Sequence, residues 1–282
     1  MIVKSPFNYI GNKYRIINEL KKFFPSKIDT MVDIFCGGCD VTANVEANKI
    51  YANDINYHVI DIMTAFQGCN TDELLEYIDM TIKKRGLSKE NEQAYIEFRK
   101  YYNKTKNPLD LYVLMCFSFN YQFRFNSSHE YNNPFGRNRS SFNERMRENL
   151  IAFKDRIENV EFSSKDFSEF DYSVLKEGDF LYADPPYLIT CGSYNDGKRG
   201  FKGWNREEDE KLMKVLDGLN GRGVKFALSN VTEHKGEKNK ELINWARGNG
   251  YHTHRIRFDY NNCNYQTKNR DNVTKEVLIT NY

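Results

Sequence analysis

The chain has 282 residues, of which 40% are hydrophobic and 28% charged, and its formal net charge is +2. This length suits one large or two modest domains with a buried core. No run of about 18 apolar residues is present, which excludes an ordinary membrane-spanning helix, and the first residues lack the pattern of a signal peptide. Because the six cysteines are scattered, we expect reduced thiols, a cytoplasmic protein and no contact with a membrane.

The first 67 residues predict one strand–helix–strand unit. A short apolar run ends in the turn Cys36-Gly37-Gly38, and a second one ends just before Asp54. The expected elements are strands at 30–35 and 50–53 and helices at 40–49 and 54–66. Cys36 and Cys39 have the spacing of half a zinc site, but no second Cys or His pair follows, so we expect no metal.

From residue 68 to residue 149 the pattern changes. Expected helices lie at 71–84, 89–104 and 109–117. Residues 119–143 are rich in aromatic residues, Asn, Ser and Arg, and Asn132-Asn133-Pro134 is typical of a turn, so this stretch predicts an exposed loop or hairpin rather than core. Between residues 99 and 147, nine basic residues against three acidic ones give a net charge of +6, which suggests contact with a polyanion. A solvated basic surface is the alternative.

Strands and helices alternate again towards the end of the chain. Strands are expected at 160–163, 180–183, 224–229, 252–258 and 275–280, and helices at 143–157, 206–219 and 237–247. We therefore predict an α/β domain built from residues 1–67 and 150–282, interrupted by a mainly helical insertion at 68–149.

The motif Asp184-Pro185-Pro186-Tyr187 follows an apolar strand directly. Proline has no N–H and a fixed φ, so two prolines stop a central strand and leave carbonyl groups unpaired. The carboxyl end of a parallel strand is where α/β sheets bind ligands. Asp184 and the Pro185 carbonyl offer two acceptors there, and Tyr187 offers a flat ring. A loop with a surface aspartate is the alternative.

Two acceptors and a ring suit a planar amine such as N6 of adenine. The lone pair of that nitrogen is delocalised into the base, so it is a poor nucleophile. Acceptors that take both N–H bonds favour the tetrahedral amine of a transition state, and a ring stacked on the base orients it. The motif predicts transfer chemistry at an exocyclic amine, without a metal or a covalent intermediate.

Seven motifs in matching order resemble the Dam-type (D12 class) family of site-specific DNA adenine-N6 methyltransferases. They are Asn8-Tyr9-Ile10-Gly11-Asn12-Lys13, Asp33-Ile34-Phe35-Cys36-Gly37-Gly38, Asn53-Asp54, Lys165-Asp166-Phe167, Asp184-Pro185-Pro186-Tyr187, Leu228-Ser229-Asn230 and Glu276-Val277-Leu278-Ile279-Thr280-Asn281-Tyr282. The resemblance implies a Rossmann-like class I methyltransferase sheet with an inserted DNA-recognition domain. It implies double-stranded DNA as substrate, S-adenosyl-L-methionine as methyl donor and flipping of the target base. We expect a monomer, with a cognate restriction endonuclease as a partner that is not stably bound.

Glycines at 37 and 38 let the backbone approach a ligand closely, and Asp54 suits the hydroxyls of a ribose. The resemblance assigns Asp54 to the cofactor ribose and Asp166 to the cofactor adenine; for both, the alternative is a helix cap or turn. The resemblance also implies cofactor contacts for Tyr9, Lys13, Phe35, Gly37, Gly38, Phe167 and Asp184. Family members usually have Trp at the position of Tyr9 and Gly at that of Asn12.

The insertion would read the DNA. Phe119-Asn120-Tyr121-Gln122-Phe123-Arg124 lies where the family has an Asn-Gly-Leu-Tyr-Arg-like stretch on a DNA-contacting hairpin. We expect Asn120 and Arg124 to contact DNA, with Arg124 pairing with guanine, and Tyr121 or Phe123 to wedge into the base stack. Arg137 and Arg139 are expected to contact phosphates. The missing glycine after Asn120 leaves the recognised sequence open.

Two other functions fit parts of the pattern. The acceptor could be cytosine N4, RNA or a protein amide, although Asp rather than Ser or Asn at position 184 favours adenine. A non-catalytic DNA-binding protein on the same fold is the second alternative.

Overall fold

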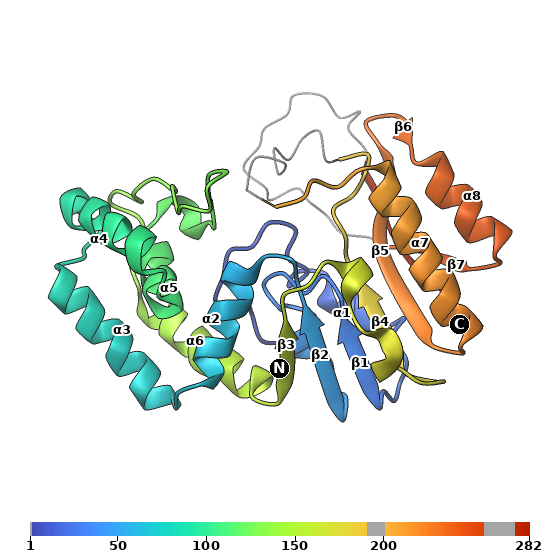
Figure 1. The fold of residues 1–282 in the computed structure, drawn as a ribbon, viewed down its shortest axis with the longest axis horizontal. Coiled ribbons are helices and arrows are strands. Elements are labelled where there is room, and N and C mark those ends of the chain that lie inside the picture. The colour runs from blue at the N-terminus through green and yellow to red at the C-terminus, as the bar shows by residue number, and fades with distance from the viewer. Residues whose placement is uncertain (1, 191–200, 257–273) are drawn as a thin grey trace.

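The computed structural model describes residues 2–190, 201–256 and 274–282. Within these residues, seven strands form a continuous sheet in the order β3-β2-β1-β4-β5-β8-β7, and a short strand, β6, pairs with β5 beside it (Figure 1). The strands are β1 Thr30–Asp33, β2 Lys49–Asn53, β3 Val160–Ser163, β4 Phe180–Ala183, β5 Lys225–His234, β6 Glu237–Lys238, β7 His252–Arg255 and β8 Thr274–Thr280.

The sheet is mostly parallel. Strands β3, β2, β1, β4 and β5 run in one direction, and β8 is antiparallel to both of its neighbours. Along β4, Phe180 and Tyr182 pack into the buried cluster on one face, whereas Leu181 and Ala183 pack into the cluster on the other, as the period of two requires. Burial on both faces explains why such strands are continuously apolar. The expected Rossmann-like α/β sheet is confirmed.

Helices cover both faces of the sheet. They are α1 Ile17–Lys21, α2 Tyr57–Gln67, α3 Thr71–Arg85, α4 Glu92–Thr105, α5 Pro108–Cys116, α6 Glu144–Ile157, α7 Arg206–Gly221 and α8 Lys240–Gly248. Apolar residues of α1, α2 and α6 belong to the first buried cluster, and those of α7 and α8 belong to the second. Among the described residues, no helix is both long and apolar enough to cross a membrane.

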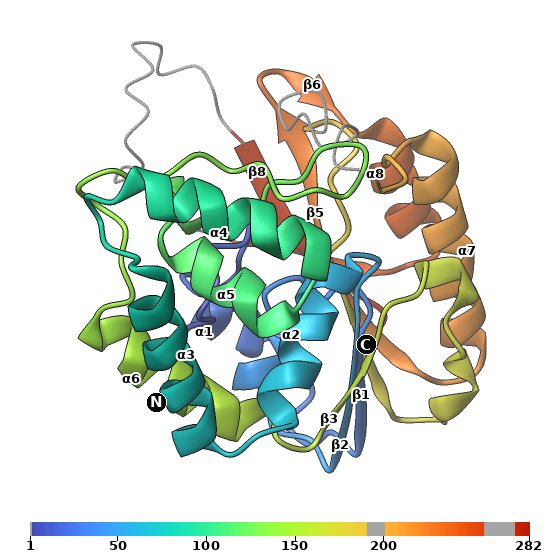
Figure 2. The ribbon, with the colours of Figure 1, turned by 60° about the vertical axis from the view of Figure 1, so that its left-hand side comes forward.

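The helices of the insertion begin at residues that favour helix N-termini. Asn70 accepts a hydrogen bond from the Glu73 amide, and the Glu73 carboxylate accepts one from the Asn70 amide, so that the two residues form a capping box for α3. Asn107 caps α5, whose first residue is Pro108. In space, α5 contacts α2, α3 and α4 (Figure 2). The first buried cluster therefore extends from the sheet into the insertion.

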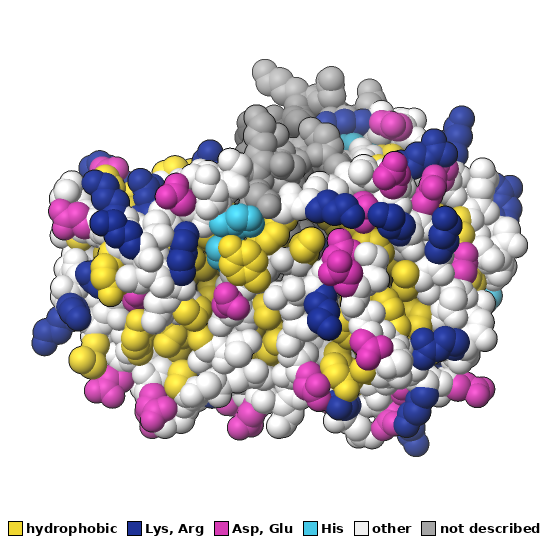
Figure 3. Space-filling model, viewed as in Figure 1, with side chains coloured by type: hydrophobic (Ala, Val, Ile, Leu, Met, Phe, Trp, Pro, Cys, Tyr) yellow, Lys and Arg dark blue, Asp and Glu magenta, His cyan; other side chains and the backbone are white. Residues whose placement is uncertain are grey.

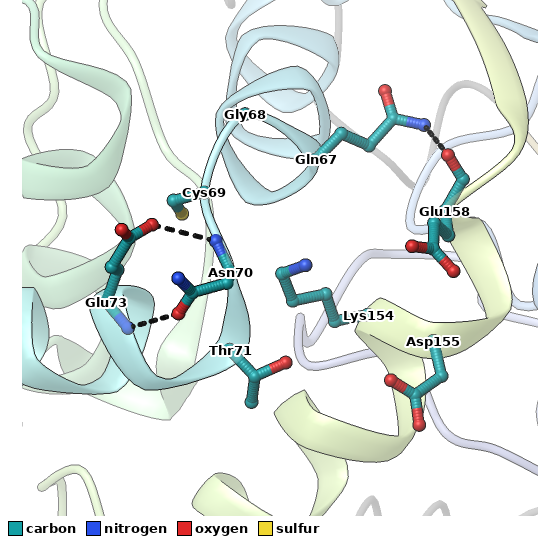
Figure 4. A pocket seen from close by; sticks show the side chains of 9 residues that line it. All are labelled: Gln67, Gly68, Cys69, Asn70, Thr71, Glu73, Lys154, Asp155 and Glu158. Carbon is teal, nitrogen blue, oxygen red and sulfur yellow. Dashed lines mark hydrogen bonds between the residues drawn. The ribbon is translucent and has the colours of Figure 1, made fainter.

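The chain enters the insertion after α2 and returns to the sheet through α6. Gln67, the last residue of α2, connects these two segments through hydrogen bonds. Its side-chain amide donates to the carbonyl oxygens of Ile157 at 2.7 Å and Val160 at 2.8 Å, and to that of Glu158 at 3.2 Å. Figure 4 shows Gln67 bonded to Glu158 on one side of a pocket whose other side includes Asn70. The bonds fasten the end of α2 to the end of α6. The boundaries 68 and 149 remain a prediction, with the second one inside α6.

The helix expected at 40–49 is wrong. The structure has only the 3-10 helix η1, Thr42–Asn44, there. Asp40 accepts a hydrogen bond from the Ser5 amide, and the Asn44 side chain accepts one from the Val3 amide and donates to its carbonyl. These side-chain bonds to the N-terminal segment compete with helix formation. Propensity could not reveal them because their partners lie 35 to 41 residues away.

The interpretation of residues 119–143 as an exposed loop rather than core needs correction. The stretch has little regular structure, with η2 at Phe119–Tyr121 and two isolated bridges. Four of its seven Phe and Tyr side chains are nevertheless buried, namely Phe123, Phe125, Tyr131 and Phe135. Aromatic residues bury large areas, so they hold an irregular backbone against α4 and α5.

Further elements differ from the prediction, and the strand expected at 224–229 is β5, which continues to His234. The strand expected at 252–258 is β7, His252–Arg255, and residues 257 and 258 lie outside the described residues. The helix expected from residue 237 begins at Lys240, because residues 237 and 238 pair with β5 as β6 and Asn239 caps α8 with its side chain.

Candidate functional site

Three acidic residues lie where neighbouring parallel strands end. Asp33 is the last residue of β1, Asp54 follows β2 and Asp184 follows β4. The strand register places Asp33 beside Ala52 and Tyr182. Because parallel strands end at the same edge of a sheet, side chains that are far apart in sequence meet there. We call Lys13, Asp33, Asp54, Asp184, Tyr187 and Glu276 the strand-end site.

Lys13 and Tyr187 both contact Asp184. The Lys13 ammonium Nζ lies 2.7 Å from Asp184 Oδ2, and the Tyr187 hydroxyl donates to Asp184 Oδ1 at 2.8 Å. Lys13 also lies 5.3 Å from the centre of the Tyr187 ring, a distance at which a cation and an aromatic face attract each other. Pro185 is buried and Pro186 is exposed. The rigid turn thus holds Asp184 and Tyr187 against one cation.

Burial governs the charges of this pair. Burial lowers the pKa of Lys13, but the carboxylates of Asp184 and Glu276 outweigh it, and the pKa of Lys13 is raised. Burial raises the pKa of Asp184, although Lys13 and the Tyr187 hydroxyl counteract this. Lys13 is therefore a firmly held cation, and Asp184 depends on it to be ionised.

Asp33 and Asp54 are buried beside this pair. Asp54 Oδ2 accepts from the Gly37 amide and Oδ1 from the Asn56 amide, both at 2.9 Å. Thr42 donates to Asp33 Oδ2 at 2.7 Å, whereas Asp33 Oδ1 is buried without a hydrogen-bond partner among the described residues. Burial raises the pKa of Asp33 to about 7, with the charges of Asp184 and Asp54 adding to the effect.

The strand-end site is therefore rich in buried carboxyl groups. Burial likewise raises the pKa of Asp40 to about 6 and raises that of Asp54. Unmatched buried negative charge disfavours folding unless it is protonated or meets a cation. A positively charged ligand fits such surroundings, and the Asp33 oxygen that lacks a partner among the described residues could accept a hydrogen bond from it.

The glycine turn is shaped by Tyr9. A Cβ atom added at Gly37 would lie 2.9 Å from the Tyr9 ring, and one added at Gly38 would lie 3.1 Å from Tyr9 Cβ. Gly37 also has a φ of +48°, in the left-handed region. Asn56 donates to the Tyr9 hydroxyl at 3.3 Å. The predicted residues Tyr9, Gly37 and Gly38 thus form one packed unit next to Asp54.

A second group of predicted residues forms an aromatic wall. Phe35 lies 5.4 Å from Phe167 and 5.6 Å from Trp204, measured between ring centres. Asp166 caps η3, Phe167–Glu169, by accepting from the amide and the hydroxyl of Ser168. The structure thus brings Phe35, Asp166 and Phe167 together, and it also shows the capping role that was the alternative for Asp166.

The five residues expected to contact DNA lie on the insertion. Asn120, Arg124, Arg137 and Arg139 are exposed, and Tyr121 is half-buried. Arg137 pairs with Glu92. Figure 3 shows Lys and Arg side chains over the helical half at the left, and histidine side chains where that half meets the sheet half.

The backbone at Asn120 and Tyr121 is unusual. Both residues have a positive φ, +54° and +55°. This region suits Gly and tolerates Asn but strains Tyr by about 1–2 kcal/mol. The glycine missing after Asn120 therefore falls at a position whose backbone favours glycine. Phe123 packs 5.2 Å from Phe7 and is buried, which leaves Tyr121 as the more accessible ring.

Several residues of the site were not predicted from the sequence to be functional. Glu276 on β8, Asp33 and Trp204 all contact or adjoin predicted residues. Glu276 and Asp33 lie inside two of the seven motifs, and an acid within an otherwise apolar strand was a usable signal. Among the described residues, no group of three or more His, Cys, Asp or Glu side chains could hold a metal ion.

Comparisons with known proteins identify the family of the chain. A family model described as D12 class N6 adenine-specific DNA methyltransferase matches residues 9–259. The chain is 49% identical over 282 residues to Type II methyltransferase M.FokI of Planomicrobium okeanokoites and 50% identical over 282 residues to Modification methylase StsI of Streptococcus sanguinis. It is 23% identical over 227 residues to the DNA adenine methylase of Escherichia coli (strain K12), covering 79% of this chain and 78% of that protein.

The first two relatives are much longer than this chain. Their alignments cover 99% of the chain but 43% of each relative. The chain therefore spans less than half the length of these two curated relatives.

Proposed function

The chain belongs to the D12 class N6 adenine-specific DNA methyltransferase family, and on that premise we propose that it methylates N6 of adenine in double-stranded DNA. One observation carries the proposal. Asp184, at the carboxyl end of β4, is held by Lys13 and Tyr187 and lies, like Asp54, close enough to Asp33 for their charges to interact. This arrangement offers acceptors and a ring next to a place for a cationic donor.

Residues of the strand-end site and the aromatic wall would hold the donor. S-adenosylmethionine supplies an electrophilic methyl group. Asp54 would accept from its ribose hydroxyls, and Asp166 from its adenine amino group. Phe35 and Phe167 would flank the adenine ring, and the backbone at Gly37 would allow close approach. The excess of buried carboxyl groups would stabilise its positive charge.

Asp184 and the Pro185 carbonyl would act on the target amine. Each would accept one N–H bond of N6, which draws the nitrogen towards a tetrahedral geometry and frees its lone pair. Tyr187 would stack on the base. The N–C bond would form as the methyl–sulfur bond of the donor breaks and leaves a neutral thioether, and N6 would gain a positive charge and then lose one proton to solvent. The nearby carboxylate of Asp184 favours that cationic stage by electrostatic attraction.

Residues 68–149 would recognise the DNA. Arg124 would read a guanine edge in the major groove, and Asn120 would contact the same stretch. Arg137 and Arg139 would fix the position of the duplex through phosphates. Tyr121 would fill the space left when the target adenine is flipped out. The exposure of the three arginines supports these roles.

The biological setting is part of the same proposal. The names of the two long relatives are those of a Type II methyltransferase and a modification methylase, which supports a role in restriction–modification. We propose that this chain acts as a monomer and forms no stable complex with its cognate endonuclease. Light scattering of the protein alone and with DNA tests the oligomeric state.

The direct test is a labelling experiment. The protein is incubated with unmethylated DNA and S-adenosylmethionine tritiated in the methyl group, and the DNA is digested to nucleosides. Label in N6-methyladenine is expected. Label in N4-methylcytosine, or none with protein that binds the donor, would contradict the proposal. DNA that already carries N6-methyladenine at the recognised site is the matched control and should accept no label.

A further inference from the structure

Glu276 lies on β8, far along the chain from the motif at Asp184, yet it reaches the same cluster. Its side chain is only 9% exposed. Glu276 Oε1 lies 3.3 Å from the Tyr187 hydroxyl and 3.8 Å from Lys13 Nζ. A buried carboxylate costs free energy unless it is paired, and Tyr187 and Lys13 are two groups that Glu276 reaches.

Asp184 already accepts from two donors, and a third would share the same carboxylate charge with them. Its Oδ1 takes the Tyr187 hydroxyl and its Oδ2 takes Lys13. The proposed reaction needs Asp184 to accept an N–H bond from the target amine as well. A phenol has one proton to donate, so Tyr187 can bond strongly to either Asp184 or Glu276 but not to both.

We propose that Glu276 is a positioning residue that accepts the Tyr187 hydroxyl when the target amine takes its place on Asp184. In the structure the hydroxyl is closer to Asp184, at 2.8 Å, than to Glu276, at 3.3 Å. Both carboxylates are within reach of the same hydroxyl oxygen, so turning the hydroxyl hydrogen about the C–O bond exchanges the two acceptors. This inference rests on the proposed function, because the amine is the group that displaces the hydroxyl.

The charge of Glu276 has a second effect on the same cluster. It raises the pKa of Lys13 and, as a like charge, raises the pKa of Asp184. Lys13 therefore stays cationic while it is shared between two carboxylates. Asp184 keeps a higher affinity for a proton donor such as an amine than it would have beside Lys13 alone.

The test compares Glu276→Gln with Tyr187→Phe and with the double variant. Glutamine keeps the size but loses the charge, so we expect kcat for N6-methyladenine formation to fall about tenfold, equivalent to roughly 1.4 kcal/mol in the barrier. Phenylalanine keeps the ring and removes the hydroxyl. In the Tyr187→Phe background the Glu276→Gln effect should shrink to less than about threefold, because there is no hydroxyl to relocate.

A pH readout separates positioning from a merely structural role. Loss of the negative charge at residue 276 makes Asp184 easier to ionise. The acidic limb of the kcat/KM profile should therefore move to lower pH in Glu276→Gln. In the ligand-free protein, NMR titration of the 13C-labelled Asp184 carboxyl carbon should show that the pKa of Asp184 is lower in Glu276→Gln than in the wild type.

The matched control is Glu233→Gln. Glu233 on β5 pairs with Lys275, the neighbour of Glu276, at 2.7 Å. Neighbouring side chains of a strand point to opposite faces of the sheet, so this variant should leave kcat and the pH profile unchanged.

Two results would overturn the inference, namely an unshifted Asp184 titration in folded Glu276→Gln and full additivity in the double variant. If wild-type protein makes no N6-methyladenine, the proposed function fails, and the NMR titration still decides the coupling of Glu276 to Asp184.

Discussion

The strand-end site and the insertion both contain residues expected to touch a ligand, but they hold these residues differently. At the strand-end site, Lys13, Asp33 and Asp54 are all buried, and Asp184 is ion-paired. On the insertion, Arg124 and Arg139 are exposed. Buried charges depend on one another, whereas exposed ones act almost independently.

Because of this difference, we expect substitutions to have different effects in the two regions. A change at the strand-end site alters several pKa values and the stability of the fold at once. A change at an exposed arginine alters binding to a partner and little else. The same contrast fits the proposed division of labour, in which chemistry needs a preorganised site and DNA reading needs side chains that can reach outwards.

The largest effect is expected from Asp184→Ala. It removes the proposed acceptor and leaves Lys13 buried without its nearest counter-charge, so methylation should fall by at least about 10³-fold and stability by about 3–5 kcal/mol. Nucleoside analysis and urea unfolding measure the two. Asp155→Ala, which removes an exposed carboxylate of α6, is the control. Turnover retained in Asp184→Ala would remove Asp184 from the mechanism.

The next effect concerns the pH dependence of stability. Burial raises the pKa of Asp33 to about 7 from 3.8. Between these pH values the folded state binds more protons than the unfolded state, so the free energy of unfolding falls as pH rises. A full shift of this size corresponds to about 4 kcal/mol. Asp33→Asn should lose less stability between pH 4 and pH 8 than the wild type.

Urea unfolding at several pH values checks this prediction. Asparagine still offers an oxygen to the Thr42 hydroxyl, so the variant changes mainly the charge. Asp155→Asn serves as the exposed control and should follow the wild-type curve. Parallel curves for wild type and Asp33→Asn would show that Asp33 does not carry a raised pKa, which would weaken the contrast between the two regions.

A smaller effect is expected on the insertion. Arg124→Ala should weaken binding to the recognised DNA by about 1–3 kcal/mol and relax discrimination at one base pair. Competition binding with specific and altered duplexes measures it. Arg145→Ala removes another exposed arginine, on α6, and is the control. If both variants lose the same affinity for every sequence, Arg124 binds phosphate and not a base.

The smallest effect is expected from Arg139→Ala. Removing an exposed side chain that binds phosphate should weaken DNA binding equally across sequences, and the slope of log affinity against log salt should become shallower by about one. Arg137→Ala should change less, because Arg137 already pairs with Glu92. Binding titrations at several salt concentrations compare the two variants. An effect that depended on sequence would contradict a positioning role.

Sequence patterns predicted the helices and strands correctly where the residues that begin or end an element lie within that element or next to it. Strands β3 and β4 match the expected bounds, and helices α3 to α6 match to within a few residues, because asparagine caps and apolar periodicity mark them. Sequence patterns gave wrong predictions where contacts with residues far away in the sequence determine the local structure. Asp40 and Asn44 bond to the N-terminal segment instead of forming a helix, and Phe123 is drawn into the core by Phe7.

The sequence by itself determined which residues end the parallel strands and turn sharply there. Asp184 and its prolines, Gly37 and Asp54 could be placed because each follows an apolar strand directly. Only the tertiary structure decided that Glu276 meets Asp184 and Lys13. Strand order across the sheet is not encoded in the alternation of any one strand, so the meeting of residues 13, 184 and 276 depends on β8 lying beside β5.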